Sequence, residues 1–124
     1  MGPTMTLLIC EDDPFIALDL CEEAERRGAH KVVVVGDSED AMRALEGHEF
    51  SAAIVDIHLA DGRSGPAIAL HLAKRGIRTI VLSGGELDCV ELADCAHVFI
   101  RKPTPAEIVI DCAHIDRSGA IEAA

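Results

Sequence analysis

Five short apolar runs recur along the chain, and the segments between them space their apolar residues as helices do. We expect strands at about residues 6–10, 31–35, 51–56, 79–83 and 97–101. Strands separated by single helices pair in parallel, because each crossover returns the chain to the same end of the sheet. The alternation therefore predicts an α/β fold, with a doubly wound five-stranded parallel sheet and helices on both of its faces.

Capping signals mark most of the expected helix ends. The expected helices run from Asp13-Pro14 to Gly28, from Asp37-Ser38 to Gly47, from Gly65-Pro66 to Gly76, within Glu86 to Asp94, and from Thr104-Pro105 to about Ile115. The fourth should be the least stable, because it is short and follows Ser83-Gly84-Gly85. The last is expected to pack through Ile108, Val109, Cys112 and Ile115.

Length and charge narrow the class of protein. The 124 residues suit one domain, with a core over about 6–115 and a frayed tail over about 117–124. A formal charge of -11 argues against binding to nucleic acid or to an anionic membrane surface. No segment has the roughly 20 apolar residues of a membrane span, and no secretory signal is present, so a cytoplasmic protein is expected. Five cysteines without a Cys-x-x-Cys pair indicate free packing thiols in a reducing compartment.

Polar residues stand where four of the strands end. Glu11-Asp12-Asp13 follow the first strand, Asp56 closes the third, Ser83 closes the fourth, and Lys102-Pro103 follow the fifth. The carboxyl ends of parallel strands share one edge, so these side chains should converge. Clustered carboxylates repel and favour a shared cation. Mg²⁺ fits oxygen ligands, whereas the scattered histidines give no zinc spacing.

A carboxylate beside Mg²⁺, a lysine and a hydroxyl is equipped to accept a phosphoryl group. Asp56 would be the acceptor, Mg²⁺ and Lys102 would each hold one phosphoryl oxygen, and Ser83 would donate to a third. Gly84 would leave space for that oxygen. Asp13 is interpreted instead as the cap of the first helix.

With these residues in this order, the chain resembles a response-regulator receiver domain of two-component signalling, over essentially its whole length. The resemblance implies the flavodoxin-like strand order 2-1-3-4-5. It implies that Asp12 and Asp56 ligate Mg²⁺ directly, that Glu11 acts through water, and that the backbone carbonyl of His58 is a further ligand. It also implies a cis proline at Pro103 and a rotating aromatic switch at Phe99.

The resemblance also implies partners. A sensor histidine kinase or a histidine phosphotransfer protein would donate the phosphoryl group, and the chain would assist its own phosphorylation and dephosphorylation without being an enzyme in the usual sense. With no effector domain in the sequence, the output would be a changed contact with another protein, or storage of phosphate. A weak homodimer is left open.

Two segments depart from the receiver pattern. The loop at residues 57–65 lacks the proline that family members often carry four residues after the acceptor. The segment from Ser83 to Lys102 is short for the family, so the fourth helix is expected to be truncated or irregular.

Three other functions fit parts of the sequence. A phosphorylation-independent adaptor with the receiver fold fits the altered loops. A phosphatase of the haloacid-dehalogenase type would need a second acid two residues after its nucleophile, where His58 stands. A dinucleotide-binding protein would need glycines where the three acids follow the first strand.

Overall fold

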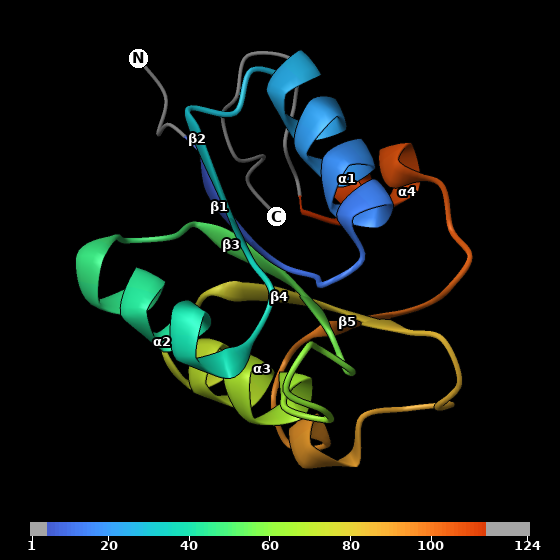
Figure 1. The fold of residues 1–124 in the computed structure, drawn as a ribbon. Helices are drawn as coiled ribbons and strands as arrows, with labels where there is room; N and C mark the ends of the chain where they lie inside the picture. The colour runs from blue at the N-terminus through green and yellow to red at the C-terminus, as the bar shows by residue number, and fades with distance from the viewer. Residues whose placement is uncertain (1–4, 114–124) are drawn as a thin grey trace.

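The computed structural model describes residues 5–113, which fold into a single sheet with helices on both sides (Figure 1). In chain order the elements are β1 (Thr6–Cys10), α1 (Pro14–Arg26), β2 (Lys31–Val35), α2 (Ser38–Gly47), β3 (Ala52–Asp56), α3 (Gly65–Lys74), β4 (Arg78–Ser83), the 3₁₀ helix η1 (Val90–Leu92), β5 (Val98–Arg101) and α4 (Ala106–Cys112). All neighbouring strands pair in parallel, in the order β2-β1-β3-β4-β5. The predicted fold class and strand order are confirmed.

Two apolar layers hold the helices against the sheet. In β1, Leu7 and Ile9 face the layer beneath α1 and α4, whereas Leu8 and Cys10 face the layer beneath α2 and α3. All four are fully buried. This alternation follows from the two-residue period of a strand, and the apolar residues on both faces are typical of a central parallel strand. Figure 1 shows the two helix pairs on opposite sides.

The helix caps form as the sequence predicts. The carboxylate of Asp13 accepts from the backbone N–H groups of Phe15 and Ile16, at 2.9 and 3.3 Å. Asp37 accepts from the N–H of Asp40 at 2.8 Å. Each carboxylate satisfies N–H groups of the first turn that have no partner within the helix. The caps fix where α1 and α2 begin, and so where the β1 and β2 loops end.

The fourth crossover differs from the predicted helix. Between β4 and β5 the chain forms only the three-residue η1, where a helix was expected within Glu86 to Asp94. Gly84 and Gly85 disfavour a helix start, and the short segment after them must also return the chain to the start of β5, which pairs in parallel with β4. Leu92 and Cys89 are buried against the α3 side of the core, so the segment is anchored by side chains.

The last helix also corrects one expectation. Val109 and Ile110 are buried, but Ile108 is 50% exposed, so it is not a core contact. The buried face of α4 follows the spacing of Ala106, Val109, Ile110 and Ala113, and Ile108 lies off that face. Ile115 and the predicted tail at 117–124 lie outside the described residues. Within residues 5–113, no helix combines the length and the apolar character needed to cross a membrane.

Candidate functional site

Three carboxylates meet at the edge where the strands end. Asp56 is the last residue of β3 and is buried, and Glu11 and Asp12 directly follow β1, the neighbouring strand. One carboxylate oxygen from each residue lies within 4.8 Å of the others. Glu11 is buried and Asp12 is exposed, so the group opens to solvent on the side of Asp12. The predicted convergence of the acidic pair on Asp56 is therefore present in the structure.

Lys102 joins two of these carboxylates. Its ammonium group donates to Glu11 Oε1 at 2.9 Å and also contacts Asp56 Oδ2. The backbone N–H of Lys102 donates to the carbonyl of Ser83 at 2.8 Å, which ties the end of β5 to the end of β4. The peptide bond between Lys102 and Pro103 is cis, as the resemblance implied.

The carboxylates are crowded enough to change their titration. Burial, and then the neighbouring Asp56, raise the pKa of Glu11 to about 7, although Lys102 opposes that change. Burial lowers the pKa of Lys102, but its hydrogen bonds to Asp56 and Glu11 outweigh burial, and the net pKa is raised. The lysine therefore stays charged, and Glu11 is the carboxyl whose ionised form is disfavoured.

One buried oxygen at this edge lacks a partner. Among the described residues, Glu11 Oε2 is the buried side-chain oxygen or nitrogen that makes no hydrogen bond. A buried carboxylate oxygen without a donor is costly, and a cation or its bound water would satisfy it. Together with the three converging carboxylates, this orphaned oxygen fits the hard-oxygen ligand set of a divalent ion such as Mg²⁺.

The hydroxyl of Ser83 lies at the end of β4, one residue beyond Leu82, which pairs with Asp56. Ser83 is buried, and its hydroxyl group is hydrogen-bonded to one residue, Glu86. Its oxygen accepts from the N–H of Glu86 at 2.8 Å, and its proton is donated to the carbonyl of Glu86 at 2.9 Å. A Cβ atom at Gly84 would meet no atom within 4 Å, so open space lies beside this residue.

The proline-lacking loop after Asp56 is held by hydrogen bonds. Leu59 and Gly62 bond to each other through both backbone groups, at 2.8 and 3.0 Å, and Gly62 has a φ of 105° that favours glycine. The N–H of Ala60, four residues after Asp56, donates to the carbonyl of Gly36 at 2.9 Å. A proline at position 60 could not make that bond. The absence of proline at position 60 therefore allows a hydrogen bond between this loop and the loop after β2.

The roles expected of His58 and Phe99 stay predictions. The backbone N–H of His58 points to Asp56 Oδ1 at 3.4 Å, and its exposed imidazole lies 3.4 Å from the carboxylate of Glu86. Phe99 pairs with Val81 in the sheet and packs, half-buried, against the core on the α3 side.

The sequence predicts Gly65 only as a helix start, but the structure gives it a second role. A Cβ atom there would lie 2.0 Å from the carbonyl oxygen of Asp56 and 2.7 Å from the Cα of Ile57. Glycine thus allows α3 to begin directly against the backbone of Asp56. The Gly-Pro pair that begins α3 was the visible signal, but only the tertiary approach shows why glycine stands there.

Comparisons with known proteins agree with this geometry. No family model matches the chain, and no curated protein matches it. Among solved structures, the chain is similar to a CheY-like response regulator receiver domain protein from Methanospirillum hungatei JF-1, with 23% identity, a TM-score of 0.77, and coverage of 88% of this chain and 90% of that chain. It is similar to SdrG from Sphingomonas melonis Fr1, with 27% identity, a TM-score of 0.74, and coverage of 90% and 95%.

A third similar structure is the receiver domain of sensor histidine kinase PA1611 from Pseudomonas aeruginosa PAO1, which has a magnesium ion coordinated in its active site cleft. It is 17% identical, with a TM-score of 0.73 and coverage of 93% of this chain and 98% of that chain. These likenesses confirm that the chain has the receiver-domain fold over nearly its whole length.

Proposed function

We propose that this chain is a phosphoacceptor signalling module in which Asp56 receives a phosphoryl group from a phosphohistidine. The donor would be a sensor histidine kinase or a histidine phosphotransfer protein. The observation that carries the proposal is the ammonium group of Lys102 between the buried carboxylates of Asp56 and Glu11, at the carboxyl edge of a receiver-type sheet. The receiver fold by itself supports only the broader class of phosphoacceptor signalling module.

The transfer is a substitution at phosphorus. A carboxylate oxygen of Asp56 forms a bond to the phosphorus atom while the bond from phosphorus to the histidine nitrogen breaks, and the electron pair of that bond stays on the imidazole. The product is an acyl phosphate on Asp56 and a free histidine on the donor. Asp56 is suited to this role because its carboxylate contacts the ammonium of Lys102 and lies in one group with the exposed Asp12.

Lys102 and Ser83 would hold the transferred group. The ammonium that now contacts Asp56 Oδ2 can follow the charge onto a phosphoryl oxygen, and the open space beside Gly84 leaves room for another oxygen near Ser83. Mg²⁺ held by Asp12, Asp56 and, through water, Glu11, with the carbonyl of His58, would neutralise negative charge on the phosphoryl oxygens.

The output would be a changed contact with another protein. Ser83 would move inward to donate to the phosphoryl group and Phe99 would follow it, so that phosphorylation biases two pre-existing conformations. A phosphorylation-independent adaptor predicts instead that Asp56→Ala leaves the affinity for the partner unchanged.

The test is phosphorylation in vitro. Wild type and Asp56→Asn are treated with acetyl phosphate and Mg²⁺, and intact-protein mass spectrometry measures the phosphoryl adduct. We expect a hydroxylamine-labile adduct on wild type and none on Asp56→Asn. Asp13→Asn is the matched control, because asparagine keeps the helix cap and the substitution removes one carboxylate from the same edge. An adduct that persists on Asp56→Asn, or is missing from wild type, refutes the assignment.

A further inference from the structure

The hydroxyl of Ser83 has one proton, and in this structure Glu86 takes it. The proton goes to the carbonyl of Glu86 at 2.9 Å, while the N–H of Glu86 donates back to the same oxygen at 2.8 Å. A serine hydroxyl is a single donor. Any phosphoryl oxygen that receives this proton must therefore take it from the carbonyl of Glu86, so one of the two hydrogen bonds that close the turn from Ser83 to Glu86 is lost.

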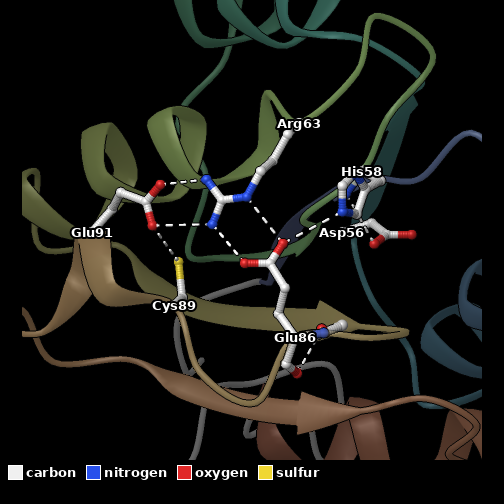
Figure 2. A network of polar contacts seen from close by, with 7 residues as sticks. Asp56, His58, Arg63, Glu86, Cys89 and Glu91 are labelled. Carbon is white, nitrogen blue, oxygen red and sulfur yellow. Dashed lines mark hydrogen bonds and ion pairs between the residues drawn. The ribbon is translucent and has the colours of Figure 1, made fainter.

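The side chain of Glu86 is held in place by Arg63 (Figure 2). Arg63, in the loop between β3 and α3, donates from Nε and Nη2 to the two carboxylate oxygens of Glu86 at 2.9 and 2.7 Å. Its guanidinium also pairs with Glu91 in η1. We call Arg63, Glu86 and Glu91 the clasp, because they bind the acceptor loop to the segment after β4.

The clasp holds a segment that has few other anchors. Cys89 and Leu92 are buried, whereas Leu87 and Val90 are 75% and 68% exposed. Arg63 holds the pKa of the Glu86 carboxyl below its usual range, so the pair is charged at neutral pH. Bidentate pairing of a guanidinium with a carboxylate also fixes geometry, which a lysine cannot do in the same way.

The clasp and the acceptor share the loop that follows β3. His58 places its backbone N–H 3.4 Å from Asp56 Oδ1 and its imidazole 3.4 Å from the Glu86 carboxylate. The carboxylate of Glu86 and the backbone that competes for the Ser83 proton belong to the same residue. Whatever holds the side chain of Glu86 therefore also opposes the release of Ser83.

We propose that the clasp formed by Arg63 with Glu86 and Glu91 sets the threshold for the response, by holding Glu86 on the hydroxyl of Ser83 until a phosphoryl group on Asp56 withdraws that proton. The inference rests on the proposed function, since the competitor for the proton is the phosphoryl group. Opening would free residues 84–92, which carry the exposed Leu87 and Val90.

The population with an open clasp and the apparent affinity for a phosphoryl analogue must then change together. If the ligand-competent form is the one with an open clasp, weakening the clasp raises the open population, and the apparent affinity for a phosphoryl analogue rises by the same factor. For a network of partly exposed ion pairs, we expect Arg63→Ala to raise both by about three- to tenfold. Arg63→Lys should fall between Arg63→Ala and wild type, because it keeps the charge and loses the bidentate pairing.

The experiment measures amide hydrogen exchange over residues 84–92 by mass spectrometry, with and without phosphorylation by acetyl phosphate and Mg²⁺. Beryllium trifluoride with Mg²⁺ serves as the phosphoryl analogue for the affinity titration. We expect faster exchange over 84–92 in phosphorylated wild type, and in Arg63→Ala before phosphorylation. Arg43→Ala is the matched control, because Arg43 also pairs with two acids, Glu39 and Asp40, but on α2.

Each outcome decides the inference. A rise in exchange in Arg63→Ala that equals the gain in analogue affinity supports it, provided that Arg43→Ala behaves as wild type. Phosphorylated wild type with unchanged exchange over 84–92, or Arg63→Ala with unchanged analogue affinity, overturns it and leaves the proposed function standing. A wild-type chain that takes no phosphoryl group overturns both.

Discussion

Replacing Gly65 with alanine tests how closely α3 must approach the acceptor strand. The added Cβ would lie 2.0 Å from the carbonyl oxygen of Asp56 and 2.7 Å from the Cα of Ile57. Both obstacles are backbone atoms, so no side-chain rotation relieves the clash. The start of α3 must move by about 1.0–1.4 Å before the carbonyl contact reaches the 3.0–3.4 Å that proteins tolerate.

The cost follows from what that movement disturbs. The N–H of Gly65 donates to the carbonyl of Ile57 at 3.0 Å, and Ile68 and Leu72 of α3 are fully buried. Overpacking in a close-packed core costs about 1–3 kcal/mol, and a lost backbone hydrogen bond adds about 1 kcal/mol. We therefore expect Gly65→Ala to lower the free energy of unfolding by about 2–4 kcal/mol.

Urea denaturation followed by far-UV circular dichroism measures this change. Gly47→Ala is the matched control, because Gly47 is the last residue of α2 and a Cβ there meets no atom within 4 Å. That substitution should stabilise the protein by up to about 1 kcal/mol, since alanine is the better helix former. A loss below about 1 kcal/mol for Gly65→Ala would refute the argument that the close approach requires glycine.

Three further predictions follow from single contacts. Lys102→Met should lower the free energy of unfolding, measured by urea denaturation in EDTA, by about 1–3 kcal/mol, because it leaves the buried carboxylates of Asp56 and Glu11 without their ammonium. A loss under about 0.5 kcal/mol would contradict this. Asp13→Ala should cost about 0.5–2 kcal/mol in the same assay, through the cap bonds of α1, and an unchanged midpoint contradicts it. Burial raises the pKa of the Cys10 thiol to about 12. Iodoacetamide at about pH 8 should therefore spare Cys10 in the native protein and label it in urea. Labelling of native Cys10 at the rate of an exposed thiol would contradict this.

The sequence predicts the sheet and the site for the same physical reason. Apolar runs of five or six residues can be central strands only if helices cover both faces, and parallel strands bring their carboxyl ends to one edge. Asp56, Lys102 and the Glu11-Asp12 pair therefore had to meet, although Lys102 is 46 residues from Asp56 along the chain. The backbone topology alone was sufficient for this part.

The features of the structure that the sequence did not predict depend on which side chains contact each other, and not on the periodic spacing of apolar residues. Arg63 has many acidic residues available, and only the conformation of the segment after β4 selects Glu86 and Glu91. The expectation that the fourth helix is truncated or irregular is confirmed, because only η1 forms there. The shortness of the segment is visible in the sequence, but the burial of Leu92 that fixes its path is not. Likewise, the need for glycine at position 65 arises from an approach to Asp56 that has no local signature.

The charge at the acceptor edge explains why the same residues limit stability and suit phosphorylation. Three carboxylates converge there, and among the described residues Lys102 is the one lysine that pairs with two of them, Asp56 and Glu11. Burial, together with the neighbouring Asp56, raises the pKa of Glu11, so the ionised form of Glu11 is already disfavoured at this edge. A phosphoryl group would replace the single charge of Asp56 with about two. Lys102 cannot balance that increase, so the site can hold a phosphoryl group stably only together with a divalent cation or with further donors such as Ser83.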